Sequence, residues 1–382
     1  MQSKRQLIIF ICLCVCLPGL TVHAYQLDKA LSPCIDDQAF ALAHLDVARL
    51  DVDALIDKAL SMVSTHMGED SAKLAHAGLD DFRSQADAQL RDLLQAGGKD
   101  VFVLFSMYDF PYFSVLIPIP PGADKDRLKQ EVQKIAQAFE LGELSTQVSG
   151  PVIRVGWKQA VTRPRSASPE RLKVLNEALQ ACADTLAQLV FCPSPDQRRV
   201  LMEMLPQISQ DLGPVQWATL SQNLDWAALG LNGPPALSMD LTIQSASAED
   251  ADSILSSIKD IYAYIGKKAE AHEEIPDLDA SFRRLTPKQE GRHLRLQVDA
   301  QTLDSLITDA LAPSLARART QARRRVCMNN HRQIGLGLFM YADDHDDKLP
   351  PDLEFSTIGK YLGSNPRIFK CPATRSENPY VY

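Results

Sequence analysis

The sequence lacks the short motifs that mark the commonest catalytic and cofactor sites. It has no C-x-x-C pair, no G-x-S-x-G elbow, no phosphate-binding G-x-x-x-x-G-K loop and no H-E-x-x-H zinc helix. These absences argue against a thioredoxin-type redox site, a zinc ribbon, a serine-hydrolase elbow and a nucleotide-binding loop. Catalytic groups can converge from distant positions. An enzyme is therefore uncertain, and a protein without enzymatic activity or cofactor is favoured.

Long apolar runs are also scarce, and the only segment apolar enough to engage a membrane lies at the start. Two basic residues precede an apolar run over residues 7–17, and Val22-His23-Ala24 has the small-residue pattern that signal peptidase accepts. The run is shorter than the roughly 20 residues of a spanning helix. We therefore expect a cleavable signal peptide over residues 1–24, cut between Ala24 and Tyr25, with an uncleaved anchor as the alternative. The mature protein would be extracytoplasmic, in the periplasm or secreted, with no stable membrane span.

An excess of positive charge is absent as well. The formal net charge of −8 becomes −10 when Lys4 and Arg5 leave with the signal peptide. Such an acidic protein is a poor general partner for nucleic acid. We expect no nucleic-acid partner and consider another envelope protein as the candidate partner.

Five cysteines remain in the mature chain: Cys34, Cys182, Cys192, Cys327 and Cys371. In an oxidising compartment they could form two disulfides and leave one thiol. Cys327 and Cys371 lie in one C-terminal segment with little core of its own, so we predict a disulfide between them. The alternative is that the cysteines are unpaired and buried, and the pairing of the other three stays open.

The body of the chain shows a recurring strand-then-helix pattern. Residues 40–63 alternate in hydrophobicity and then switch to helical spacing, and the pattern returns at residues 293–311. There, Asp304-Ser-Leu-Ile coincides with Asp53-Ala-Leu-Ile. Residues 113–139 and 237–265 form a second similar pair. Similar units at two places in the chain indicate an internal duplication.

We therefore predict an α+β fold with two similar strand–helix halves packed in two layers, followed by a long C-terminal helix. A helix is expected over residues 170–190, between the halves. The predicted organisation is a signal peptide at 1–24, a first half at 25–161, a linker and helix at 162–195, a second half at 196–311 and a C-terminal segment at 312–382.

The C-terminal segment begins with a basic amphipathic helix. At helical spacing one face is apolar, and Arg317, Arg324, Arg325 and Arg332 share another. Such arginines can touch anionic lipid or an acidic partner. The alternative is a solvated helix face paired with nearby aspartates.

Several short sequence elements follow one another in this segment in a specific order. They are an Ala-Arg-rich run ending at Cys327, Asn329-Asn330, Gln333-Ile334-Gly335-Leu336, Tyr341-Ala342, an acidic turn before Leu349-Pro350-Pro351, and Cys371-Pro372. This order resembles the pilin- and pseudopilin-G-like segment of exported planctomycete-type bacterial proteins. The resemblance covers residues 312–382 and implies a small pilin-like module on an exported body.

The chain departs from assembling pseudopilins in one respect. Their subunits are anchored by a long apolar N-terminal helix, whereas the residues before the basic run include Asp304, Ser305, Thr308 and Asp309. These side chains are too polar to enter a bilayer. A filament subunit is therefore not expected.

The acidic turn at Asp343, Asp344, Asp346 and Asp347 is a weak candidate for a calcium site, because clustered carboxylates suit hard cations. Its spacing does not follow the EF-hand pattern, since Lys348 stands where an oxygen ligand and a glycine should follow. A solvated acidic turn is favoured.

These observations favour a non-enzymatic exported protein, a structural or interaction module that carries a pseudopilin-like C-terminal segment. The alternative is an extracytoplasmic ligand-binding protein or hydrolase with a site between the two halves. A deep pocket lined by convergent polar groups would favour the alternative.

A non-reducing mass map of the mature protein tests two of these expectations together. We expect an N-terminal peptide that starts at Tyr25 and a cross-linked peptide pair that contains Cys327 and Cys371. Retention of Met1 contradicts the cleaved signal peptide. Recovery of Cys327 and Cys371 as reduced thiols contradicts the disulfide.

Overall fold

The computed structural model describes residues 27, 31–67, 69–110, 112–138, 144–208, 222–235, 237–271, 282–306, 312–351, 355–362 and 366–369 of the chain. Contacts divide the chain into two units, residues 1–310 and 311–382. Each unit is described by itself below.

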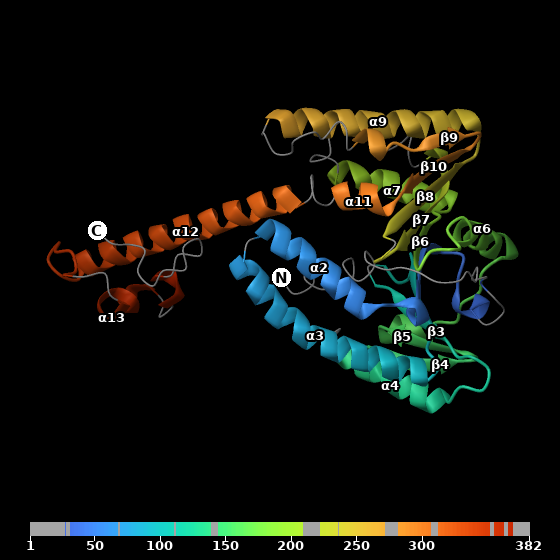
Figure 1. The fold of residues 1–382 in the computed structure, drawn as a ribbon, viewed down its shortest axis with the longest axis horizontal. Coiled ribbons are helices and arrows are strands. Elements are labelled where there is room, and N and C mark those ends of the chain that lie inside the picture. Colours follow the sequence, from blue (N-terminus) through green and yellow to red (C-terminus); the bar gives the residue numbers. More distant parts are fainter. Residues whose placement is uncertain are drawn as a thin grey trace. The chain divides into compact units, whose positions relative to one another are not determined.

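The first unit is built on a single antiparallel sheet (Figure 1). Among the described residues it has ten strands in the order β4-β5-β3-β2-β1-β6-β7-β8-β10-β9. Their bounds are β1 Ala39–Asp46, β2 Asp100–Ser106, β3 Ser114–Pro118, β4 Ser145–Ser149, β5 Val152–Gly156, β6 Ala187–Phe191, β7 Leu224–Asn232, β8 Ser238–Ser245, β9 Lys288–Glu290 and β10 His293–Val298. With the helices of this unit, the sheet confirms the predicted α+β class.

The strand order is the same in both directions from the central β1–β6 pair. From the centre to one edge the order is β1-β2-β3-β5-β4, and from the centre to the other edge it is β6-β7-β8-β10-β9. On each side, the fifth strand in chain order therefore lies between the third and the fourth. A helix links the third strand to the fourth on each side: α4 (Lys125–Ala138) and α9 (Ala248–Ala271). The two stretches of chain therefore share one continuous sheet.

Only one of the two sequence resemblances falls on matching places in this sheet. Residues 113–139 and 237–265 correspond to β3–α4 and β8–α9, which occupy the same position on either side. The resemblance between residues 40–63 and 293–311 instead joins central β1 to β10, which lies next to the edge. The sheet order thus gives no support to the correspondence between residues 40–63 and 293–311.

Alternation of side chains along the strands defines the two faces of the sheet. Leu42, Leu104 and Leu116 point to one face and pack with Leu175 and Leu179 of α6 (Pro169–Gln180). On the opposite face, Ile117, Ile153 and Val155 pack with α4, and β10 packs with α9. α6 therefore lies on one face, and α4 and α9 on the other.

The other helices of this unit are α2 (Val52–Met67), α3 (Glu69–Gln95), α5 (Lys158–Thr162), α7 (Pro195–Ile208) and α11 (Ala300–Leu306). Short 3-10 turns cover Ser32–Cys34 and Val47–Arg49. α3 packs beside α2 and α4, on the side of the sheet away from α6 in Figure 1.

The helix predicted over residues 170–190 is wrong in its second half. α6 starts with Pro169 after the N-cap Ser168, whose hydroxyl accepts the Arg171 N–H at 3.2 Å. It ends at Gln180, and residues 187–191 form β6 between β1 and β7. Pairing at the sheet centre overrides local helix propensity, because Val190 fills the core there with no exposure.

A buried arginine, Arg165, connects three segments of the chain that lie against the first half of the sheet. The Arg165 side chain has no exposure and forms ion pairs with Asp36 and Asp109. It also donates to Ser114 Oγ at 3.1 Å and to the Ala160 carbonyl at 3.2 Å. Four acceptors therefore surround the two terminal nitrogens of this buried guanidinium, whereas its Nε has no hydrogen-bond partner among the described residues.

In the second unit, a long helix packs on short turns. α12 (Ala312–Asp343) contacts α13 (Phe355–Ile358) and two 3-10 turns, Gly359–Leu362 and Pro366–Phe369. Ile334 joins Ile358, Leu362, Ile368 and Phe369 in a small core. At Gly337 a Cβ would lie 2.6 Å from Leu362 Cδ2, so a larger residue there would force the Leu362 side chain to shift.

Among the helices of the described residues, none combines the length and the apolar character needed to cross a membrane.

Replacing Arg165 with Met should lower the free energy of unfolding by about 3–5 kcal/mol, because buried Asp36 loses its cationic partner and buried Asp109 keeps only Arg163, at 3.1 Å. Urea unfolding of the full chain measures the change. Lys134→Met is the control: its pair with Glu131 is largely exposed on the Lys134 side, and its loss should cost about 1 kcal/mol or less. Equal effects of the two substitutions would contradict the structural role of Arg165.

Candidate functional site

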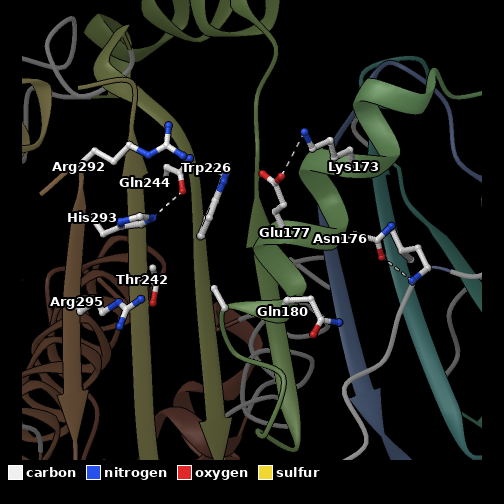
Figure 2. Close-up of a pocket in the computed structure, with 12 residues that line it drawn as sticks. Lys173, Asn176, Glu177, Gln180, Trp226, Thr242, Gln244, Arg292, His293 and Arg295 are labelled. Atoms are coloured by element: carbon white, nitrogen blue, oxygen red, sulfur yellow. Dashed lines mark hydrogen bonds and ion pairs between the residues drawn. The ribbon is translucent and has the colours of Figure 1, made fainter. Parts of the chain in front are cut away.

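A cavity of about 690 Å³ lies between α6 and the outer strands of the second half of the sheet (Figure 2). Its walls come from α6, from β7, β8 and β10, and from the segment before β1. It is lined by Leu27, Lys173, Asn176, Glu177, Gln180, Ala181, Trp226, Thr242, Gln244, Arg292, His293 and Arg295.

The sheet wall of the cavity follows from strict alternation along β8 and β10. Thr242 and Gln244 point toward the cavity, while Ile243 between them packs with α9. Across the strands, Gln244 is opposite both Trp226 and His293, and Thr242 is opposite Arg295. These polar side chains are therefore direct cross-strand neighbours on one face.

The opposite wall is the polar side of α6. Leu175, Ala178 and Leu179 are buried against the sheet, whereas Lys173, Asn176, Glu177 and Gln180 line the cavity (Figure 2). Asn176 Oδ1 accepts the backbone N–H of Leu27 at 2.7 Å, which fastens the segment before β1 to α6. The helix thus closes the core with one side and shapes the cavity with the other.

Trp226 is the most unusual group in the cavity. Its side chain is only 5% exposed, and its indole N–H has no hydrogen-bond partner among the described residues. In Figure 2 the nitrogen edge of the ring points toward α6, on the side where Glu177 lies. Buried donors are nearly always paired, and an unpaired one costs about 1–3 kcal/mol. The indole N–H is therefore a buried donor without an acceptor in the described protein, and its nitrogen has almost no surface accessible from the cavity.

Positive charge predominates around the cavity. Lys173, Arg292 and Arg295 line it, against a single carboxylate, Glu177, which lies 3.9 Å from the Lys173 ammonium. Arg295 Nη1 is 3.3 Å from Glu290 Oε2, with both side chains more than half exposed, so that pair is weak in water. A local positive field stands out in a chain of net charge −8.

The polar side chains of the lining include both hydrogen-bond donors and acceptors. His293 Nε2 lies 2.8 Å from Gln244 Oε1, so its ring is held by the neighbouring strand. Glu177, Thr242 and Lys173 also line the cavity, and these residue types can act as nucleophiles or in proton transfer. The cavity thus presents mixed polar groups on a preformed wall.

The basic residues predicted to form an interaction surface lie elsewhere. Arg324, Arg325 and Arg332 are exposed on α12, in the second unit. Arg317 belongs to the same helix, but its side chain lies outside the described residues. None of them lines the cavity, and their role as an interaction surface stays a prediction.

The acidic turn follows the end of α12. Asp343, Asp344, Asp346 and Asp347 are all exposed. Asp344 accepts the Tyr361 hydroxyl at 2.7 Å, and this hydrogen bond lowers the pKa of its carboxyl. Over the residues that the structure describes, no three His, Cys, Asp or Glu side chains are grouped so that they could hold a metal ion.

Three of the five cysteines are buried with free thiols: Cys34, Cys182 and Cys192. Burial raises the pKa of Cys182 to about 12 and that of Cys192 to about 11, and it also raises the pKa of Cys34. No second disulfide forms among these three. Cys371 and the cleavage site at Ala24 and Tyr25 lie outside the described residues, so the Cys327–Cys371 disulfide and the cleavage stay predictions.

The cavity residues were missed by sequence reasoning. The alternation in residues 293–298 predicts a strand, but it does not show what lies against the polar face of that strand. The usable signal was that these positions carry His293 and Arg295. Nothing local in the sequence could show that α6 and Trp226 face them.

Native-state labelling with a neutral thiol reagent should leave Cys34, Cys182 and Cys192 unmodified, because burial blocks access and the raised pKa values suppress the thiolate. All three should react once the chain is unfolded in urea. Mass mapping of the labelled peptides gives the result. Rapid native labelling of any of the three would contradict their burial.

Comparisons with known proteins add a family match in the C-terminal segment. A family model described as "Protein of unknown function (DUF1559)" matches residues 316–365, within the C-terminal segment at residues 312–382. No curated protein matches the chain. The solved structure titled "Structure of crystal form I of TP0453" aligns with a TM-score of 0.30 and 11% identity, covering 74% of this chain and 97% of that chain.

Proposed function

We propose that this chain is an exported, non-enzymatic binding protein that holds a small ligand in the cavity between α6 and strands β7, β8 and β10. A preformed polar cavity of about 690 Å³, walled by paired strands and a capped helix, carries the proposal. Export rests on the signal-peptide pattern of residues 1–24.

The size and construction of the cavity support ligand binding. Its volume of about 690 Å³ lies within the roughly 300–1,000 Å³ of ordinary small-molecule sites. Its walls are paired strands and a capped helix, so little ordering should be needed when a ligand binds.

The C-terminal segment favours a second role, contact with another envelope protein through a pseudopilin-like module closed by the Cys327–Cys371 disulfide. In α12, Met328, Leu336 and Phe339 are 61–78% exposed beside the exposed arginines. Large apolar side chains mixed with arginine are typical of protein interfaces. The family match over residues 316–365 supports a distinct module here.

We also propose that the body arose by duplication of a five-stranded unit. The support is the identical outward strand order from the β1–β6 pair and the equivalent places of α4 and α9. The similar sequence patterns at residues 113–139 and 237–265 agree with this assignment.

Filling the cavity should abolish binding. Ala181 lines the cavity and is exposed at the end of α6, so Ala181→Trp should obstruct the cavity without disturbing the core. In a thermal-shift screen of charged and neutral metabolites, a ligand at about 100 times its Kd stabilises the native chain by about 2.7 kcal/mol. We expect this stabilisation in the unmodified chain and its loss in Ala181→Trp.

The matched control is Ala88→Trp, an exposed alanine on α3, which should respond like the unmodified chain. Compounds that stabilise Ala181→Trp and Ala88→Trp equally bind elsewhere. If every stabilising compound behaves in that way, the cavity is not the binding site.

A further inference from the structure

We propose that His44, Asp46 and Asp100 form a proton-sensitive clasp, which holds β1 to β2 and β6 more tightly in mild acid than at alkaline pH. The clasp lies at the end of β1 and the start of β2, and it does not depend on the proposed ligand cavity. Three observations carry the inference: the hydrogen bonds of the His44 ring, the stacking of that ring on Phe102, and the pairing of two carboxylates across the strands.

The His44 ring is only 6% exposed, and each of its nitrogens faces an oxygen. Nε2 lies 2.9 Å from Asp100 Oδ1, and Nδ1 lies 3.1 Å from Gln188 Oε1. The orientation of the Gln188 amide is fixed, because its Nε2 donates to the Cys182 carbonyl at 2.8 Å. Oε1 is therefore the atom that faces His44, and it can only accept a hydrogen bond, as can the carboxylate of Asp100.

Only a protonated ring satisfies both acceptors. A neutral imidazole carries one N–H, whereas an imidazolium carries two. Loss of the proton leaves a nitrogen lone pair facing an oxygen, so one of the two cross-strand hydrogen bonds is lost. The His44 ring also stacks on Phe102, with 4.4 Å between the ring centroids and 18° between the planes, and an aromatic face attracts a cation.

The two carboxylates of the clasp repel each other. Asp46 and Asp100 are direct partners in the register of β1 and β2, and like charges placed opposite each other destabilise a strand pair. Burial and the Asp100 carboxylate raise the pKa of Asp46, whereas Arg49 and His44 act in the opposite direction with smaller effect. A group with a raised pKa stabilises the fold fully below its unfolded pKa, and this contribution is lost as the pH rises through the folded pKa. Protonation of Asp46 and protonation of the ring therefore stabilise the fold in the same direction.

The other ionisable groups near the clasp lie at its edge or stay neutral. Arg49 Nε is 4.0 Å from Asp46 Oδ2, and Arg49 Nη2 donates to the Asp184 carbonyl at 3.5 Å. Asp184 and Lys99 are exposed, so solvent and salt screen their charges. On the β6 side, burial raises the pKa of the Cys182 thiol to about 12. The protonation of the three clasp residues therefore decides how the clasp responds to pH.

Asp100→Asn tests the clasp with little change of side-chain shape. An amide can donate to the neutral ring or accept from the protonated ring, and it removes the charge opposite Asp46. Urea unfolding of the full-length mature protein gives the equilibrium constant for unfolding. Between about pH 5.5 and about pH 8.5, we expect this constant to rise at least about 3-fold more in the unmodified chain than in Asp100→Asn.

Asp196→Asn is the matched control. It removes the charge of an 88% exposed carboxylate on α7, and it should keep the pH dependence of the unmodified chain. The histidines outside the clasp are the same in all three proteins, so their titration cancels in the comparison.

The ring itself provides a second measurement that needs no variant. In ¹⁵N-edited spectra of the mature protein, contacts with Phe102 assign the His44 ring. We expect two N–H protons on this ring at about pH 5.5 and one at about pH 8.5.

Two outcomes overturn the inference. One is an equal pH dependence of unfolding in the unmodified chain and in Asp100→Asn, or a difference of the opposite sign. The other is a His44 ring that carries a single N–H proton at both pH values.

Discussion

The buried contact between Arg165 and the two carboxylates of Asp36 and Asp109 is the constraint on which the rest of the first unit depends. It joins the segment before β1, the turn after β2 and the chain between α5 and α6, at a point with no solvent exposure. α6 begins only four residues later, at Pro169. The ion pairs therefore fix where the helix starts over the sheet, and this in turn fixes which part of the sheet the helix covers. Loss of one member of such a buried group leaves an uncompensated charge in the interior, so the three segments are held in this arrangement together.

On this face of the sheet, α6 covers only some of the strands and the short α5 lies over β4 and β5, so the two halves of the face differ. In the first half, Leu42, Leu104 and Leu116 form a dry core with α6 and the segment before β1. In the second half, the same face carries Thr242, Gln244 and Arg295, and α6 reaches only its near edge, over β6 and β7. The buried core and the cavity thus lie on the same face of the sheet. In the first half the side chains at alternate strand positions are apolar and form the core, whereas in the second half they are polar and line the cavity.

The class of fold was predictable from sequence because its signals are local. Alternation predicted the strands at β1 and β10, and the β3–α4 and β8–α9 patterns fall on equivalent places in the sheet. β6 was missed because Leu186 to Phe191 form a short apolar run directly after a helical stretch, and periodicity alone cannot separate a buried strand from a helix there. The burial of Arg165 and the cavity were beyond reach for a different reason. Both depend on groups more than 50 residues apart in the chain, such as Arg165 with Asp109 or Gln180 with His293, and no local pattern encodes their meeting.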